Sequence, residues 1–199
     1  MKKQFESDRI SPVDLHQIPV LQNVEVRDSL HLRPLAETDA PRILEILAAD
    51  PNIRQRVSIA EAMKTNVDVC REIETAREDP GLIRYAILHS GNPIGLISFW
   101  SDDGVAFGTP PAWNDYGFGY FLDKDFRGQG IITAAMSRIM DIATHNLPVH
   151  QFIAFCEQDN PKSAAVLRRL GFQPTGQLFG ELKHGWREEK YIKPIVKAQ

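Results

Sequence analysis

Apolar residues recur with two different periods along the chain, and the change between them predicts a protein of mixed helices and strands. Alternation at every second position, or a short apolar run, predicts a strand or hairpin at 24–33 and strands at 84–88, 93–100, 116–122, 151–156, 172–180 and 185–192. Spacing by three and four predicts helices at 38–47, 58–78, 128–145 and 160–170. The segment 151–156 is almost continuously apolar, which indicates a strand buried on both faces near the centre of a sheet.

Two of these helices carry boundary signals. Asn160 can cap the last helix, Pro161 suits its first turn, and Gly171 follows its end. In the helix that is expected to begin at residue 58, Ser58 and Glu61 have the spacing of a capping box. We therefore expect both helices to begin at these caps.

The length and charge of the chain narrow its class. Its 199 residues suit one domain with a substantial core, and we expect 1–23 to be an extension and 24–199 to be that domain. A net charge of -3 and a pI near 6.1 disfavour a nucleic-acid partner. The first residues lack the apolar run of a secretory signal, and no run reaches membrane-spanning length, so we expect a cytoplasmic protein without a membrane partner.

The cysteines and histidines offer no metal site. Cys70 and Cys156 both fall in apolar-periodic segments, which favours small core residues over a disulfide framework or metal ligands. The 6 histidines show no metal-ligand spacing and no companion cysteine or carboxylate set. We therefore expect no metal cofactor.

Residues 119–133 contain the strongest sign of function, because a strand-like run leads into a glycine turn and then into a helix. Gly128 and Gly130 allow a backbone to approach a ligand closely, and the N–H groups of a helical first turn can bind an anion such as a pyrophosphate. The alternative is that two glycines only turn a strand into a helix. The segment is neither a P-loop, which needs Lys-Ser/Thr after its last glycine, nor a dinucleotide fingerprint, which has a third glycine where Thr133 stands.

Four features resemble the GNAT superfamily of acetyl-CoA-dependent N-acetyltransferases, and more narrowly its ribosomal-protein alanine and serine N-acetyltransferases. They occur in order and with suitable spacing over roughly residues 24–195. They are Leu32-Arg-Pro-Leu35, Gly119-Tyr-Phe-Leu122 before Arg127-Gly-Gln-Gly-Ile-Ile-Thr133, Asn160 and Ser163 with Leu170-Gly-Phe172, and Lys183-His-Gly185 in the closing hairpin.

The resemblance implies an α/β (α+β) fold, with a mixed, mostly antiparallel twisted sheet that is splayed at its centre and has helices on both faces. It implies acetyl-CoA as the acyl donor, with the pantetheine arm in the splay and the pyrophosphate on the glycine turn. The implied cofactor-binding residues are Phe121, Leu122, Arg127, Gly128, Gln129, Gly130, Ile131, Ile132, Thr133, Asn160 and Ser163.

The chain departs from the family pattern at two positions. Ile132 stands where many relatives have Gly or Ala, although the ribosomal-protein branch commonly has a larger apolar residue there. Leu167 stands where many relatives have the tyrosine that protonates the departing thiolate. The chemistry must therefore use another donor, or none.

The resemblance also implies a catalytic pair. Glu181 stands where the branch has a glutamate that takes the proton of the amine, and Ser163 stands where a hydroxyl lies near the coenzyme A sulfur. A solvated hairpin glutamate and an ordinary first-turn serine are the alternatives. Glu188 and Glu189 are weaker base candidates because their run is typical of an exposed edge, and Asp115 is a rim candidate.

These features predict acetyl transfer to an amine by direct attack in a ternary complex, since no motif places a cysteine as a covalent carrier. An α-amino group has an unperturbed pKa near ~8 and a lysine near ~10.4, so a protein or peptide N-terminus is the favoured acceptor. A small-molecule amine such as an amino acid, polyamine or antibiotic is the alternative acceptor, and a non-catalytic acyl-CoA-binding sensor is the alternative class.

Outside these motifs, the aromatic residues in the loops have two possible roles. Phe107, Trp113 and Trp186 either line an acceptor groove or pin their loops to the core. The exposed final strands leave homodimer formation open.

Overall fold

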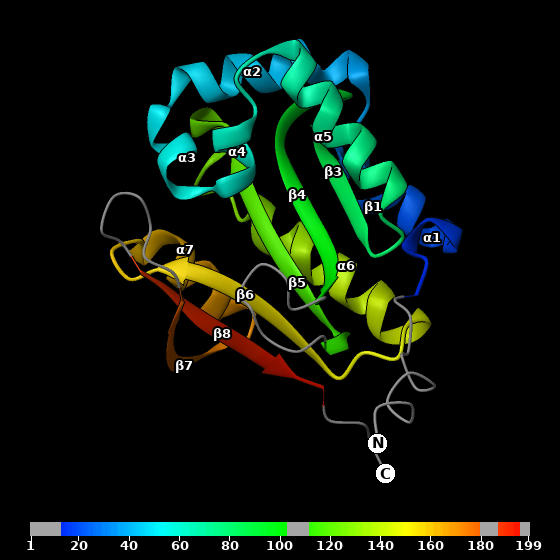
Figure 1. The fold of residues 1–199 in the computed structure, drawn as a ribbon, viewed down its shortest axis with the longest axis vertical. Coiled ribbons are helices and arrows are strands. Elements are labelled where there is room, and N and C mark those ends of the chain that lie inside the picture. Colours follow the sequence, from blue (N-terminus) through cyan, green and yellow to red (C-terminus); the bar gives the residue numbers. More distant parts are fainter. Residues whose placement is uncertain (1–12, 103–111, 180–186, 196–199) are drawn as a thin grey trace, which may run out of the picture.

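A computed structural model describes residues 13–102, 112–179 and 187–195. Its centre is an eight-stranded sheet with the strand order β1-β2-β3-β4-β5-β6-β8-β7 (Figure 1). Neighbouring strands run antiparallel except β5 and β6, which run parallel. The strands are β1 (Val24–Arg27), β2 (Leu30–Pro34), β3 (Leu82–His89), β4 (Asn92–Asp102), β5 (Ala112–Leu122), β6 (Gln151–Glu157), β7 (Gln173–Phe179) and β8 (Glu188–Pro194). The expected mixed, mostly antiparallel sheet is confirmed.

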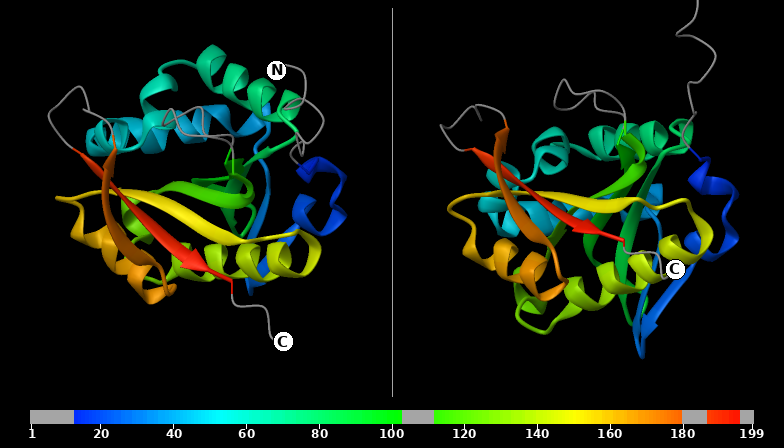
Figure 2. Two further views of the ribbon diagram at one scale, coloured as in Figure 1. Left: turned by 60° about the horizontal axis from the view of Figure 1, so that its bottom comes forward. Right: turned by 90° about the horizontal axis from the view of Figure 1, so that it is seen from below.

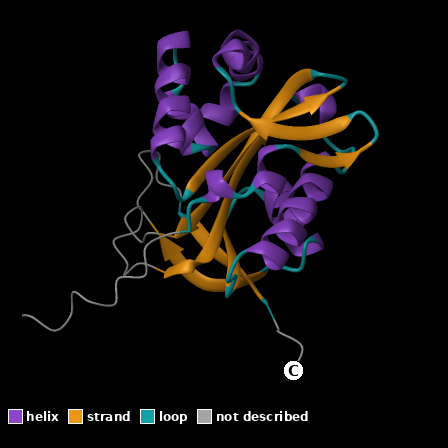
Figure 3. Ribbon diagram, turned by 90° about the vertical axis from the view of Figure 1, so that its right-hand side faces the viewer, coloured by secondary structure: helices purple, strands orange, loops and turns teal. Residues whose placement is uncertain are grey.

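Helices cover both faces of the sheet (Figures 2 and 3). On one face lie α6 (Ile131–Asn146) and α7 (Pro161–Arg169), and on the other lie α2 (Ala40–Ala49) and α5 (Asn66–Glu78). The shorter elements are η1 (Leu15–Gln17), α1 (Pro19–Gln22), η2 (Glu37–Asp39), α3 (Pro51–Arg56), α4 (Ser58–Ala62) and η4 (Lys124–Phe126). We call the two sides of the sheet the α6 face and the α2 face.

The alternation of side chains along β5 fills both cores. Tyr116 and Phe118 belong to the core under α6, together with Met136, whereas Phe121 belongs to the core under α2, together with Ile43. Successive residues of a strand point to opposite faces, so one strand serves two helical layers. Residues of β5 with even numbers therefore point to the α6 face, and residues with odd numbers point to the α2 face.

The sheet opens between its two parallel strands. Pairing of β5 with β6 runs from Asp115 and Gln151 to Phe118 and Ala154 and does not continue beyond them. On its other side, β5 stays paired with β4 as far as Leu122. The carboxyl ends of β5 and β6 therefore diverge, which is the splay that the resemblance implied. We call this opening the V.

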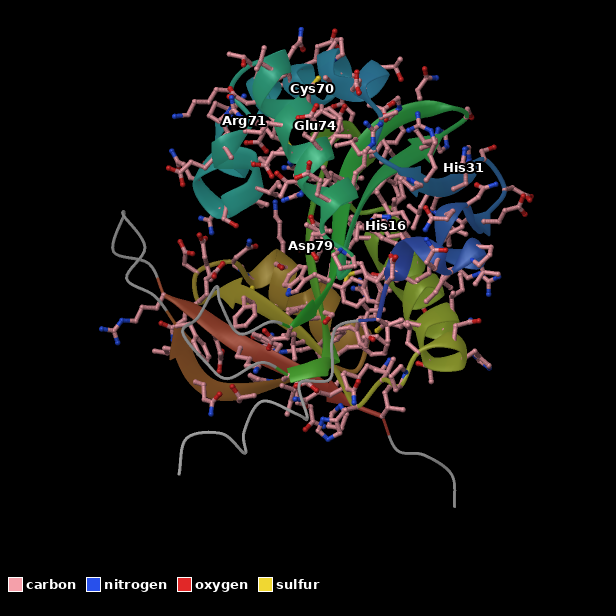
Figure 4. All side chains as sticks on the ribbon, turned by 45° about the vertical axis from the view of Figure 1, so that its right-hand side comes forward. His16, His31, Cys70, Arg71, Glu74 and Asp79 are labelled. Carbon is pink, nitrogen blue, oxygen red and sulfur yellow. The ribbon has the colours of Figure 1, made fainter. Side chains whose placement is uncertain are left out.

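The segment before β1 packs against the domain. Leu15 and Leu21 are both fully buried, and the backbone N–H of Leu15 donates to the carbonyl of Pro80 at 2.7 Å. His16 Nε2 lies 2.9 Å from the carbonyl oxygen of Ala76 and 3.1 Å from that of Asp79, at the end of α5 (Figure 4). A ring N–H there satisfies carbonyls that the helix leaves without partners. Residues 13–23 thus pack against the domain.

The single helix expected at 58–78 is wrong. The chain forms α4 (Ser58–Ala62) and α5 (Asn66–Glu78) instead, and no side chain caps α4. Thr65 and Asp68 form the capping box, in which the Thr65 hydroxyl accepts from the backbone N–H of Asp68 and the Asp68 carboxylate accepts from that of Thr65. The pattern at Ser58 and Glu61 has the correct spacing, but the helix that it starts is only five residues long.

Two further expectations concern the cysteines and the membrane. Cys156 is buried as expected, but Cys70 is only half-buried on α5, so it is not a core residue. In the part of the chain that the structure describes, no helix combines the length and the apolar character needed to cross a membrane.

Candidate active site

The glycine turn joins the end of β5 to the start of α6. Gly128 has φ +78° and Gly130 has φ +72°, and a Cβ at either position would find no atom within 4 Å. Both backbones therefore adopt a conformation that favours glycine, and the space above them is open. Ala134 N donates to Gly130 O, so the N–H groups of the preceding residues lie before the first helical hydrogen bond. This is the geometry of an anion site at a helix N-terminus.

The first turn of α6 also offers a side chain to a ligand. The Thr133 hydroxyl is buried and has no hydrogen-bond partner among the described residues. A buried hydroxyl without a partner is unfavourable, and a bound phosphate or amide could supply the missing bond. Ile131 and Ile132 are buried in the core, so their side chains anchor the helix and leave their backbone N–H groups for a ligand. These observations fit the pyrophosphate of a coenzyme.

Arg127 holds the turn in place from the protein side. Its Nη1 lies 2.7 Å from Asp50 Oδ2, and its Nε and Nη2 donate to Leu122 O at 3.0 and 2.8 Å. Asp50 caps α3, since its carboxylate also accepts from the backbone N–H of Asn52. Burial pushes the pKa of Asp50 upward, but the bonds from Arg127 and Asn52 outweigh it and lower the pKa. The guanidinium is thus engaged with the protein, and a direct cofactor contact by Arg127 stays a prediction.

Gln129 is likewise bonded within the protein. Its side-chain amide donates to Asp125 O at 3.2 Å, and its carbonyl accepts from Arg27 Nη2 at 3.2 Å. If Gln129 contacts the pyrophosphate as predicted, its backbone N–H is the group that remains for this contact.

Phe121 and Leu122 lie on one wall of the V. Both are paired with β4, at Leu96 and Gly95, and both lie beyond the last pair of β5 with β6. The backbone groups of these two residues that face β6 therefore form no strand pairing with it. A ligand that binds like an added strand needs such groups for its hydrogen bonds. Their side chains enter opposite cores, so cofactor contacts from these residues would come from the main chain.

On the α6 face of the V, polar side chains of α7 and β5 are hydrogen-bonded to one another. Asn160 caps α7 as expected, and its Oδ1 accepts from Ser163 N at 3.1 Å. Ser163 Oγ lies 2.8 Å from Tyr120 Oη. Burial raises the pKa of the Cys156 thiol on β6, and the neighbouring Ser163 hydroxyl acts in the opposite direction. Ser163 thus joins α7 to β5 through Tyr120, and Cys156 of β6 lies nearby.

Leu167 takes no part in this cluster. It is fully buried in the core between α7 and the sheet. The helix position that many relatives give to a tyrosine is therefore a packing position here, and the hydroxyl nearest to Ser163 comes from Tyr120 instead.

The α2 face of the V carries carboxylates. Glu157 ends β6, and its Oε2 accepts from Arg56 Nη1 at 2.7 Å, while Asp159 Oδ1 accepts from the same nitrogen at 2.9 Å. Glu188 on β8 is the register partner of Glu157, so both side chains point to the same face. Burial raises the pKa of Glu188, and the charge of Glu157 raises it further. A half-buried carboxylate with a raised pKa suits a general base.

The exposed edge expected at Glu188 and Glu189 is wrong. Strand β8 lies between β6 and β7 inside the sheet, and both glutamates are half-buried. Glu189 Oε1 accepts from Gly176 N at 3.1 Å, and Glu189 is paired with Cys156. Of the two, Glu188 is the one on the same face as Glu157.

Asp115 is placed away from the V. It lies at the first pair of β5 with β6, where the sheet is closed, and its carboxylate oxygens bond to His150 Nδ1 and Gln151 Nε2. This position does not suit a base that must reach an amine in the V. Glu181, Phe107 and Trp186 lie outside the described residues, as does the side chain of Trp113.

Metal ligation has no support in the described part of the chain, where no group of His, Cys, Asp and Glu could hold an ion. Sequence reasoning also missed Tyr120 and Cys156 as neighbours of Ser163. The available signal was the loss of a tyrosine at Leu167, together with a tyrosine in the strand that leads into the glycine turn.

Comparison with known families identifies the family of the chain. The Acetyltransferase (GNAT) domain family matches residues 29–173. The chain belongs to the GNAT family of acetyltransferases. The glycine turn, the V and α7 all fall within or directly beside the matched residues.

Two curated GNAT relatives are named for ribosomal substrates. The chain is 27% identical over 158 residues to YdaF of Bacillus subtilis, a putative ribosomal N-acetyltransferase, and this covers 77% of the chain and 82% of YdaF. It is 24% identical over 161 residues to the ribosomal-protein-serine acetyltransferase of Escherichia coli, covering 79% of the chain and 86% of that protein. The expected resemblance to the ribosomal-protein branch is confirmed.

A solved structure confirms the GNAT fold. The ribosomal alpha-N-protein acetyltransferase RimL, in complex with coenzyme A, superimposes with a TM-score of 0.74 at 20% identity. The match covers 87% of this chain and 98% of that chain.

Proposed function

We propose that this GNAT acetyltransferase transfers the acetyl group of acetyl-CoA to the α-amino group of a protein or peptide N-terminus. Ribosomal proteins are the acceptor class that the two curated relatives suggest. The observation that carries the proposal is the V. An opening in the sheet lets a thioester enter from one face and an amine from the other, so that the two can meet between β5 and β6.

The two faces of the V differ in chemistry, which supports direct attack in a ternary complex. Ser163 and Tyr120 lie on the α6 face, which is also the face of the open glycine turn. Glu157 and Glu188 lie on the α2 face. A cationic amine is attracted by carboxylates, and the diphosphate of a coenzyme is attracted by a helix N-terminus. The two substrates would thus meet from opposite sides of the sheet.

In the proposed reaction the amine nitrogen attacks the thioester carbonyl carbon, the C–S bond breaks, and coenzyme A leaves as a thiolate. Glu181 takes the proton that the amine loses, and Ser163 donates a hydrogen bond to the developing thiolate. Glu188 is the rival for the base, because it is the described carboxylate with a raised pKa on the amine side of the V. An α-amino group, with a pKa near ~8, needs little help to lose its proton.

The test measures thiol release with acetyl-CoA and a matched peptide panel. Peptides that begin with Ala or Ser and have a free N-terminus are compared with the same peptides blocked at the N-terminus but containing lysine, and with small amines. We expect release only with free N-termini, and mass spectrometry should place the acetyl group on the α-nitrogen. Transfer to small amines alone would favour the small-molecule alternative, and coenzyme binding without amine-dependent release would favour a sensor.

A further inference from the structure

The hydrogen bond between Tyr120 and Ser163 suggests a role for a residue that lies outside the binding motifs. The two oxygens are 2.8 Å apart, although the residues are 43 positions apart in the sequence. Tyr120 lies beyond the last pair of β5 with β6, so its strand segment forms a wall of the V. Leu167 cannot supply a hydroxyl here, since it is an apolar core residue.

The direction of this hydrogen bond decides what Ser163 can do. If Ser163 donates to Tyr120, its hydroxyl hydrogen points at the phenol and is lost to the V. If Tyr120 donates, the phenol hydrogen is satisfied and the serine hydrogen is free for another acceptor. The second arrangement avoids a phenol hydrogen without an acceptor in a largely buried position.

The surroundings favour donation by the phenol. Burial raises the pKa of Tyr120 to about 12, even though the bond to Ser163 acts in the opposite direction, so the phenol keeps its hydrogen. The titratable neighbour that adds to this effect is Cys156 on β6, which itself lies near Glu157 and Glu188. The thiol of Cys156 is directed at the carbonyl oxygens of Glu157 and Asn160, at 3.4 and 3.6 Å, so its hydrogen bonds do not require the hydrogen of Ser163.

We propose that Tyr120 is a positioning residue for acetyl transfer, whose phenol donates to Ser163 and thereby directs the serine hydroxyl hydrogen at the thioester sulfur. This rests on the proposed function. Tyr120 makes no covalent bond and gives up no proton in this role. A chain of hydrogen bonds polarises each member, so the phenol also strengthens the bond that Ser163 offers to the thiolate.

The first test is a double-mutant cycle measured with acetyl-CoA and an accepted peptide. Tyr120→Phe should lower kcat about tenfold, which is less than the 10²–10³-fold effect of removing a direct donor in other enzymes, because Tyr120 acts through Ser163. The double variant Tyr120→Phe, Ser163→Ala should be no slower than Ser163→Ala alone. Additive losses would overturn the proposal, because they would show that Tyr120 acts independently of Ser163.

Tyr116→Phe provides a matched control. Tyr116 lies on the same strand and the same face, and burial raises its pKa to about 12 as well. Its hydroxyl has no hydrogen-bond partner among the described residues. We therefore expect Tyr116→Phe to keep the wild-type kcat, and an equal loss in both variants would overturn the proposal.

A second test changes the acidity of the phenol and keeps its shape. Replacing Tyr120 by a difluorotyrosine lowers the pKa of the phenol into an accessible range. Below that pKa, kcat should be retained; above it, the ionised phenol must accept from Ser163, and kcat should fall. The same replacement at Tyr116 should leave the pH profile unchanged. A profile without a new alkaline fall at position 120 would overturn the proposal, and this variant remains informative if Tyr120→Phe fails to fold.

A third readout does not depend on turnover. The fluorine resonance of the position 120 variant should move when coenzyme A is added, and Ser163→Ala should abolish that movement. No movement in a protein shown by calorimetry to bind coenzyme A would also overturn the proposal. If the wild-type protein transfers acetyl groups but the Tyr120 variants give the contrary results, the proposed function is supported and the role of Tyr120 is rejected.

Discussion

Arg56 Nη1 donates to the carboxylate of Glu157 at 2.7 Å, and this pair joins helix α3 to the end of strand β6. The Glu157 side chain is 2% exposed and that of Arg56 is 26% exposed. The other end of α3 is held by Asp50, which is paired with Arg127 beside the glycine turn. One short helix is therefore fastened to both sides of the V.

Replacement of Arg56 by Met should destabilise the protein. The change removes the cation that faces a buried carboxylate, and we expect the free energy of unfolding to fall by about 2 kcal/mol. Urea denaturation measures the difference. The control is Arg77→Met, since Arg77 and Glu37 form an ion pair of 3.3 Å in which both side chains are more than half exposed. The control should cost less than about 1 kcal/mol, and equal losses would contradict the buried character of the Arg56 pair.

Gly130→Ala should weaken coenzyme binding as well as stability. A side chain at φ +72° costs about 1 kcal/mol, and its Cβ would occupy the open space above the turn. Gly176→Ala is the matched control, because Gly176 has φ +76° and equally open surroundings but lies in β7. Both variants should lose similar stability in thermal denaturation. In calorimetry only Gly130→Ala should lose affinity for coenzyme A, and equal affinities would remove the turn from the binding site.

Thr133→Val should separate stability from affinity. The hydroxyl of Thr133 is buried without a partner among the described residues, so its removal should leave the free protein as stable as before or slightly more stable. If a coenzyme supplies the missing bond, the same change should reduce coenzyme affinity about tenfold. Thr144→Val on the same helix removes a hydroxyl that donates to Met140 O, and it should lose stability without losing affinity. Unchanged affinity in Thr133→Val would mean that the hydroxyl does not face the ligand.

The half-buried carboxylate of Glu188 should make the stability of the protein depend on pH. The folded protein holds the pKa of Glu188 above its ordinary value of 4.5, so the folded state binds more protons than the unfolded state in the window above that value. Stability should therefore fall as pH rises through this window, and Glu188→Gln should flatten that fall.

For catalysis, a base must be ionised. If Glu188 serves, kcat/KM of the wild type should decline as pH falls through the raised pKa, and Glu188→Gln should lower kcat and remove that acidic limb. If Glu181 serves, Glu181→Gln should lower kcat with little change in coenzyme affinity, and Glu188→Gln should keep the profile. Comparison of the two profiles decides between them.

Local signals in the sequence were enough to predict several elements. Asn160, Pro161 and Gly171 mark both ends of α7, and each acts within a few residues of its own position. Gly128 and Gly130 likewise take the positive φ that a turn before a helix requires. The glycine turn could be predicted because short-range patterns of this kind determine it. The overall fold could be predicted because these patterns were combined with the resemblance to a known family.

The features that the sequence did not reveal depend on contacts between separate structural elements. Arg54 Nη1 donates to the carbonyls of Ala60 and Met63 around the end of α4, at a point where the apolar pattern alone would continue the helix. The bonds of Tyr120 to Ser163 and of Arg127 to Asp50 depend on the angle at which separate elements cross. No spacing in a single sequence encodes that angle.

The packed segment ahead of β1 sets a limit on truncation. A shortened chain that began at Val24 would still contain the whole family match, which starts at residue 29. It would nevertheless lose two fully buried leucines, each contributing about 2 kcal/mol, together with the histidine that closes the end of α5. We therefore expect a chain cut back to the family match to unfold more readily than one that keeps residues 13–23.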